Sequence, residues 1–191
     1  MSEQKPLATI AAKEEFRQLL DIRGATPEDD FSQIKAWMLT PEFTDVIGAM
    51  QGLPPEEITD FLLNRNLGRS AFCYSVITPE DRVIRGFYLV GFDQRNRLAH
   101  LSGGFTRSEG RRYLAWRTID VLLDNLFDNL GVYKVVVRIA ATNRKMLFSF
   151  LGNTRFYKEA VLREEILQPN GKRSDMIVFA ATANMSRRSA F

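Results

Sequence analysis

The chain has 191 residues with 45% hydrophobic and 11% aromatic content, enough apolar material for one domain with a sizeable core. It carries 26 Lys and Arg against 23 Asp and Glu, and this net charge of +3 is too small to indicate a nucleic-acid partner. The sequence holds neither an apolar run of about 18 residues nor a charged-then-apolar leader, so we expect no membrane span and no signal peptide.

The N-terminal third predicts an extension, a short strand and two helices. Residues 1–18 form the extension, and Leu20–Arg23 is a short strand candidate. Thr26 and Pro27 then predict a helix start, with a capping Thr and a Pro at the first helical position. Pro54–Glu57 opens a second helix that we expect to end near residue 66.

Three strands follow, over residues 71–78, 83–92 and 97–105, joined by turns at 79–81 and 93–96. The first contains Cys73, the only Cys of the chain. A single Cys cannot form an internal disulfide, which favours a reducing, cytoplasmic compartment. Its apolar neighbours indicate a buried strand residue rather than a nucleophile.

The loop Thr106–Arg112 has one Gly and three Arg directly before a long helical pattern. The free N–H groups at a helix N-terminus stabilise a phosphate through hydrogen bonds and the helix dipole, and flanking Arg side chains add charge-assisted donors. The loop is therefore suited to an anion, although an isolated Arg-rich segment is also typical of a solvated turn.

An amphipathic helix is predicted from Leu114 to Leu130, with Gly131 at its end. Residues 132–140 are mostly β-branched and predict an interior strand. Asn143 then begins a second amphipathic helix, and a strand follows it. This alternation predicts a βαβα unit.

This order of phosphate loop, helix, buried strand, Asn-led helix and strand resembles the acyl-CoA half of a GCN5-related N-acetyltransferase. Arg107 and Gly110 match the family's pyrophosphate-binding pattern, whereas Arg112 stands where the family has Gly or Ala. Phe156 and Glu159–Arg163 resemble an ending common in the Rim-type branch, which acetylates ribosomal-protein N-termini, and in enzymes that acetylate small amines. The resemblance covers roughly residues 20–181.

The resemblance implies an α/β (α+β) single-domain fold. We expect a central, mostly antiparallel mixed sheet of about seven strands, flanked by about four helices, with a splay between the fourth and fifth strands. The domain is expected over residues 19–182, after the extension at 1–18 and before a tail at 183–191.

The resemblance also implies acetyl-CoA as co-substrate and no metal. In that family the backbone at the end of the fourth strand pairs with the pantetheine arm of the cofactor. Two adjacent Gly at this place indicate a bulge, a close backbone approach or a flexible strand end. The residues expected to bind the cofactor are Gly103, Gly104, Phe105, Arg107, Ser108, Glu109, Gly110, Arg111, Arg112 and Asn143.

His100, the chain's only His, takes the place in the fourth strand where the family often has a Glu base. An imidazole accepts a proton near neutral pH without a large pKa shift, so His100 is a candidate base. Alternatively, His100 is an ordinary polar strand residue whose ring is satisfied by hydrogen bonds to its neighbours.

The family's usual Tyr proton donor is missing, which leaves Ser149 as a candidate hydroxyl. A Ser within a helix commonly bonds the carbonyl four residues back instead. Glu164 and Glu165 are neighbours on the next strand, so their side chains are expected on opposite faces. One of them could reach the acceptor, or both could take part in ordinary strand pairing. Arg155 replaces the Gly that precedes Phe156 in the family.

Three functions remain open. The first is acetyl transfer from acetyl-CoA to a primary amine, either a small molecule or a protein N-terminus, by direct attack in a ternary complex. The second is a noncatalytic CoA- or partner-binding protein, which Arg112, Arg155 and the missing Tyr would favour. The third is an acyltransferase that uses a longer acyl-CoA or an acyl carrier protein, whose acidic surface would suit the Arg-rich loop. The sequence does not decide between a monomer and a homodimer.

Overall fold

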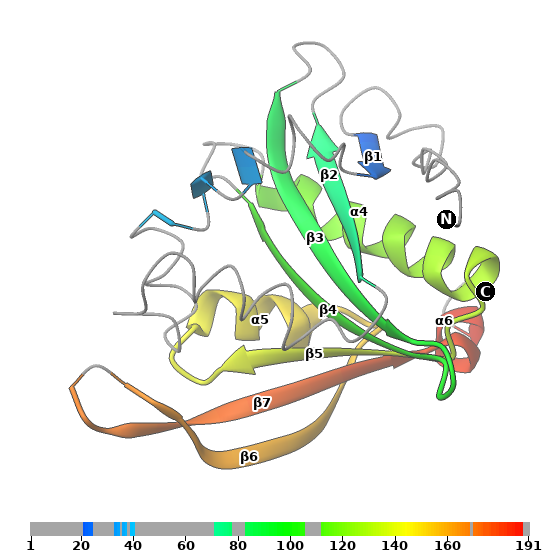
Figure 1. Cartoon of the computed structure of the whole chain (residues 1–191). Helices are drawn as coiled ribbons and strands as arrows, with labels where there is room; N and C mark the ends of the chain where they lie inside the picture. Colours follow the sequence, from blue (N-terminus) through cyan, green and yellow to red (C-terminus); the bar gives the residue numbers. More distant parts are fainter. Residues whose placement is uncertain are drawn as a thin grey trace.

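The computed structural model describes residues 21–24, 33–34, 36–37, 39–40, 71–77, 83–105, 112–168 and 170–188. Its centre is a seven-stranded sheet with the strand order β1-β2-β3-β4-β5-β7-β6 (Figure 1). The strands are β1 (Asp21–Gly24), β2 (Ala71–Ile77), β3 (Ile84–Asp93), β4 (Leu98–Phe105), β5 (Lys134–Ala140), β6 (Tyr157–Leu167) and β7 (Arg173–Thr182). β4 and β5 pair in parallel, and the other neighbours pair antiparallel. The predicted mostly antiparallel mixed sheet is confirmed.

The described helices are α4 (Arg112–Asp124), α5 (Arg144–Gly152) and the short α6 (Ala183–Arg188). A π-helical turn, η4 (Asn125–Asn129), extends α4, and Gly131 follows with a φ of 65°. None of the helices in the described part of the chain is long and apolar enough to cross a membrane. The helices predicted from residues 26 and 54 lie outside the described residues, apart from helical residues at 33–34 and 36–37. The segment after β7 is helical rather than frayed.

The core lies between one face of the sheet and the helices α4 and α5 (Figure 1). Alternate residues of β4 and β5 point into it, including Ala99, Leu101, Val135 and Val137. The helices contribute Ile119, Leu122, Leu123, Leu126, Phe127 and Phe150 to the same cluster. The residues between the core residues of each strand therefore face the opposite side of the sheet.

A buried hydrogen bond joins the sheet to α4. The Tyr88 hydroxyl on β3 lies 2.9 Å from the Thr118 hydroxyl on α4. Burial strongly raises the pKa of Tyr88, so its hydroxyl stays protonated. This bond fixes α4 over β3, the strand that supports β4.

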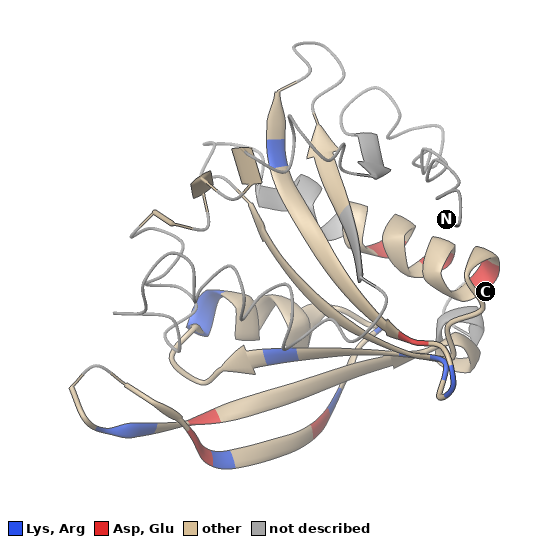
Figure 2. Ribbon diagram, viewed as in Figure 1, with Lys and Arg blue, Asp and Glu red and all other residues tan. Residues whose placement is uncertain are grey.

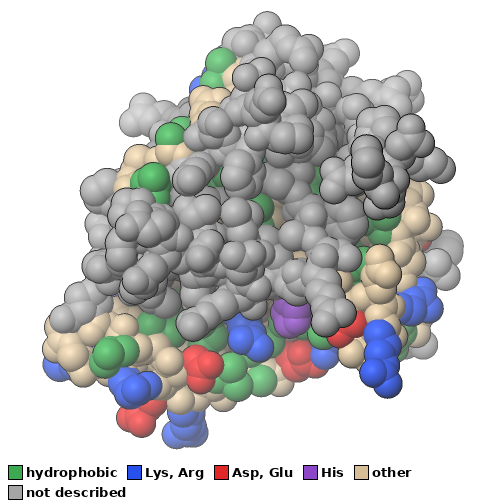
Figure 3. Space-filling view, in the orientation of Figure 1, with side chains coloured by type: hydrophobic (Ala, Val, Ile, Leu, Met, Phe, Trp, Pro, Cys, Tyr) green, Lys and Arg blue, Asp and Glu red, His purple; other side chains and the backbone are tan. Residues whose placement is uncertain are grey.

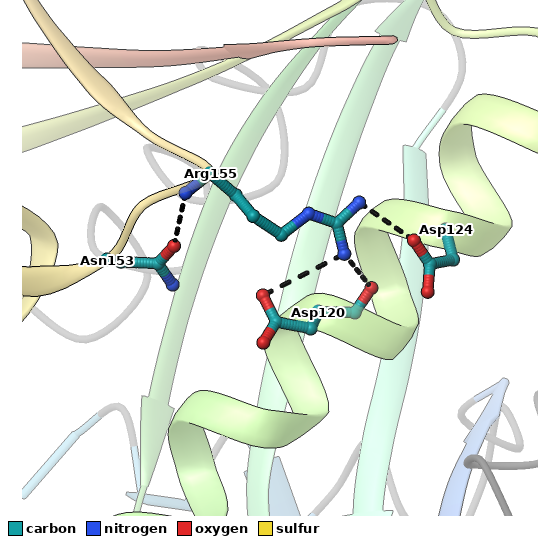
Figure 4. A network of polar contacts seen from close by, with 4 residues as sticks. All are labelled: Asp120, Asp124, Asn153 and Arg155. Carbon is teal, nitrogen blue, oxygen red and sulfur yellow. Dashed lines mark hydrogen bonds and ion pairs between the residues drawn. The ribbon is translucent and has the colours of Figure 1, made fainter. Parts of the chain in front are cut away.

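Arg155 connects the turn between α5 and β6 to α4 (Figure 4). Its guanidinium donates to the Asp120 carbonyl at 2.9 Å and to the Asp124 carboxylate at 2.8 Å. Its backbone N–H donates to Asn153 Oδ1 at 2.8 Å. A Gly at this position, as in the family pattern, would make none of the side-chain contacts.

Candidate active site

β4 and β5 part in the middle of the sheet. Their parallel register joins Leu98–Leu101 to Lys134–Val137 and ends there. β4 continues to Phe105 beside β3, while β5 continues to Ala140 beside β7. Figure 1 shows the two strands diverging from their shared end. The predicted splay is confirmed, and beyond Leu101 the backbone edge of β4 that faces β5 has no partner strand in this register.

Gly103 lies where β4 packs closely on β3. A Cβ at Gly103 would stand 2.7 Å from the Phe87 carbonyl oxygen and 2.9 Å from the Tyr88 ring. The register between β3 and β4 is regular through Gly103 and Gly104, so the two Gly do not mark a bulge, and Gly103 marks a close approach to β3. Phe105 then packs edge-on against Tyr88, with ring centroids 5.3 Å apart.

The open edge of β4 is therefore held in place from behind. Because β3 pairs with β4 along its whole length, the β4 backbone groups that have no partner strand among the described residues point in fixed directions. An extended ligand with amide groups can satisfy such an edge by pairing as a short strand. The pantetheine arm of CoA is a ligand of this kind, and its binding by Gly103, Gly104 and Phe105 stays a prediction.

His100 lies two residues before the splay opens. It is half-buried on the sheet face opposite α4, level with Gly91 of β3 and Val136 of β5. Within the described part of the chain it makes no hydrogen bond or ion pair. Figure 3 shows the His side chain, in purple, on the surface in view. The role of His100 as a base, and the alternative of a His satisfied by its neighbours, both stay predictions.

The pKa of His100 lies below its ordinary value of 6.5. Partial burial is the largest cause because it disfavours the charged ring, and the positive charge of Arg138 acts in the same direction. Asp93 opposes both. The imidazole is therefore neutral at pH 7, which is the form that accepts a proton.

Arg138 was not singled out from the sequence. It interrupts an otherwise apolar strand, with Val137 and Ile139 buried on either side, and that charged interruption is the signal that could have indicated it. Its side chain is exposed on the same face as His100. Figure 2 shows a blue segment part-way along β5.

Two predicted site residues lie on or next to α5. Asn143 is its N-cap, and its side-chain oxygen accepts a hydrogen bond from the Met146 N–H at 3.3 Å. Ser149 donates from Oγ to the Lys145 carbonyl at 2.9 Å. This is the local bond expected of a Ser inside a helix. A proton donated by Ser149 would first have to leave that bond, and the catalytic role of Ser149 stays a prediction.

Glu164 does not lie with His100. It is exposed, with a φ of 52°, in an irregular stretch of β6 between Leu162 and Ile166. Its backbone N–H donates to Asp175 Oδ1 at 2.9 Å, and its carbonyl accepts from Arg173. Asp175 lies on β7, five residues from Ala180. Ala180 pairs with Val136 of β5, and Val136 pairs with His100 of β4. Five strand residues span roughly 17 Å.

The predicted phosphate loop lies mostly outside the described residues. Arg107, Ser108, Glu109, Gly110 and Arg111 are not described, and Arg112 is described only as the first residue of α4. Because α4 begins at Arg112, the prediction of a helix directly after the loop is confirmed. The anion-binding role of the loop stays a prediction.

No protein-family model matches the sequence, and no curated protein matches it either. Solved structures do match. Spermidine N-acetyltransferase from Vibrio cholerae, in complex with CoA and spermine, aligns with a TM-score of 0.71 over 88% of this chain and 98% of its own, at 16% identity. The chain has the fold of the GCN5-related N-acetyltransferases.

Two further structures support this fold. A chimera of Vibrio cholerae spermidine N-acetyltransferase SpeG and hSSAT aligns with a TM-score of 0.71, at 18% identity, over 88% of this chain and 98% of its own. A provisionally assigned acetyltransferase aligns with a TM-score of 0.66, at 12% identity, over 90% of this chain and 89% of its own. The splay and His100 lie in the part of the sheet where the sequence resemblance predicts acyl transfer.

Proposed function

We propose that the protein is an acetyl-CoA-dependent N-acetyltransferase that acts on a primary amine in a ternary complex. The observation that carries this proposal is the splay between β4 and β5, with a supported open backbone edge next to a neutral His. A noncatalytic protein would need the opening only for binding. The position of a proton acceptor beside it favours catalysis.

The transfer needs a neutral amine close to a polarised thioester. His100 takes a proton from the acceptor ammonium, directly or through water. The amine nitrogen then attacks the thioester carbonyl, so a C–N bond forms and the C–S bond breaks. A main-chain N–H at the end of β4 stabilises the negative charge that develops on the carbonyl oxygen. As the C–S bond breaks, the nitrogen loses its second proton and the departing thiolate takes one up, by way of water or of the Ser149 hydroxyl, which is reprotonated in the same transfer.

A small amine is the acceptor that we propose, rather than a protein N-terminus. The Vibrio cholerae relative by fold binds spermine, a small amine, in its solved complex. The Rim-type resemblance rests on the ending Phe156 and Glu159–Arg163, a segment at the start of β6, which two strands, β5 and β7, separate from β4 in the sheet. That segment says little about the acceptor.

The departure at Arg155 does not favour a noncatalytic protein. Its side chain is only 13% exposed and bonds α4 through Asp120 and Asp124. This is a structural reason for Arg where the family pattern has Gly, and it leaves the splay unaltered.

Calorimetric titration with acetyl-CoA tests the donor site. We expect saturable binding to the wild type that is lost in Gly110→Glu, because the variant places a carboxylate in the predicted phosphate loop. Gly152→Glu is the matched control, since Gly152 is exposed at the end of α5 with open space around it. A folded wild type that binds no acetyl-CoA would refute the proposal.

A further inference from the structure

Arg138 is placed to meet the acceptor. The last pair between β4 and β5 joins Leu101 to Val137, so Arg138 is the first β5 residue beyond the point where the strands part. It shares its face with His100, which lies level with Val136 two residues earlier. From the spacing and rise of strands, the Cα atoms of His100 and Arg138 are about 8 Å apart.

The Arg138 side chain is exposed, and among the described residues it makes no hydrogen bond or ion pair. Two other cations near the β4–β5 pair are engaged. Lys134 pairs with Glu159, and Arg97 donates to the Gly131 carbonyl at 2.6 Å. The neighbours of Arg138 on its own face are apolar, with Val136 and Ala140 on β5 and Val178 opposite on β7.

Two acidic side chains of the described residues, Asp93 and Glu159, bear on this face, and each already has a partner. Asp93 ends β3 level with Leu98, at the closed end of the β4–β5 pair, and its carboxylate accepts from Asn96. Glu159 is engaged by Lys134. Among the described residues, Arg138 is therefore the charged side chain at the point where the strands part, and a cation at that point is unfavourable for a polycation such as spermine.

We infer that Arg138 binds an anionic group of the acceptor, so that the substrate is an amine carrying a carboxylate rather than a polyamine. The planar guanidinium presents paired donors that match a carboxylate, and its apolar neighbours strengthen the interaction. A carboxylate held there leaves the amine of the same molecule within reach of His100. This inference rests on the proposed function and names the class of its substrate.

The test is a panel of matched acceptors assayed by thiol release from acetyl-CoA. The panel pairs common α-amino acids, β-alanine and γ-aminobutyrate with their amides, and adds spermidine. The proteins are the wild type, Arg138→Gln, Arg138→Lys and Arg163→Gln, an exposed Arg on β6 that serves as the control. Ratios of variant to wild type cancel the intrinsic reactivity of each amine.

We expect the wild type to prefer acids over amides. In Arg138→Gln the KM for acids rises roughly 10- to 100-fold, as expected for loss of a charge-assisted pair, while the KM for amides and for acetyl-CoA stays within about 2-fold. Arg138→Lys retains part of the preference, and the control retains all of it. Equal loss for acids and amides, an increased KM for acetyl-CoA in Arg138→Gln, or a wild-type preference for spermidine would overturn the inference.

A binding readout separates this inference from the proposed function. N-acetylated acids and their amides are titrated calorimetrically into the protein with and without CoA. Binding of the acids alone, lost in Arg138→Gln, supports the anion site even where no amine is turned over, and in that case it is the proposed catalysis that fails. No preference for the acids in a protein that binds acetyl-CoA would contradict the inference and leave the donor site standing.

Discussion

His100 is the residue on which the proposed chemistry depends. We predict that His100→Gln lowers kcat about 10²- to 10⁴-fold at pH 7, the usual contribution of a general base. The KM for acetyl-CoA should stay unchanged, because His100 lies before the splay and not along its open edge. Steady-state kinetics across pH measure both, and full turnover by the variant would refute the role of His100.

The fall of kcat/KM on the acid side of its pH profile should also depend on His100. Because burial and Arg138 lower the pKa of His100, the ring stays neutral to below pH 6.5, and kcat/KM should fall only under that value. Arg138→Gln removes a positive charge, so its acid limb should move upward toward 6.5. For an acceptor without a carboxylate, such as an amino acid amide, an unmoved limb in this variant would show that another group controls the profile.

Gly103 is required by packing. In Gly103→Ala the new Cβ would meet the Phe87 carbonyl and the Tyr88 ring, so we expect a loss of about 1–3 kcal/mol in the free energy of unfolding. Gly152→Ala is the control, because Gly152 ends α5 with no atom within 4 Å of a Cβ. Urea denaturation of both variants measures the difference, and equal stability would contradict the close approach.

At the scale of elements, the contact of Arg155 with α4 should stabilise the packing of the α5–β6 turn. We predict that Arg155→Ala lowers the free energy of unfolding by about 1–3 kcal/mol, because it leaves the Asp120 carbonyl and the Asp124 carboxylate without this donor. Arg163→Ala, on an exposed strand position, should change it by less than about 0.5 kcal/mol. Denaturant unfolding tests both, and similar values for the two variants would show that the Arg155 contacts contribute nothing.

The elements themselves were largely predictable from the sequence. Alternating and 3.6-residue patterns are local, so the strands between Ala71 and Ala140, the helix before Gly131 and the start of the helix after Asn143 were predicted close to their observed bounds. The π-helical turn and α6 were not predicted. The role of Arg155 depends on the packing of α5 beside α4, which is not a local property of the sequence.

The candidate site was only partly predictable for the same reason. His100, Gly103 and Gly104 were identified by their places in one strand. The importance of Arg138 becomes visible only with the register between β4 and β5, because that register puts it at the splay beside His100. Glu164 was placed by strand alternation, and the irregular stretch of β6 breaks that alternation.

At the scale of the whole molecule, the fold matches solved acetyltransferases over most of their length at low identity. Such similarity establishes the architecture, and the function must come from the groups at the splay. The organisation into a domain at 19–182 with an extension at 1–18, and the formation of a homodimer, stay predictions. Most of the N-terminal segment lies outside the described residues.

The central claim is acetyl transfer to an amine, and mass spectrometry of the acceptor tests it most directly. The purified protein is incubated with acetyl-CoA and the panel of amino acids, amides and spermidine, beside His100→Gln. The account predicts an acceptor heavier by one acetyl group, formed with the wild type and strongly reduced with the variant. Saturable acetyl-CoA binding without any acetylated amine, or equal product with both proteins, would contradict it.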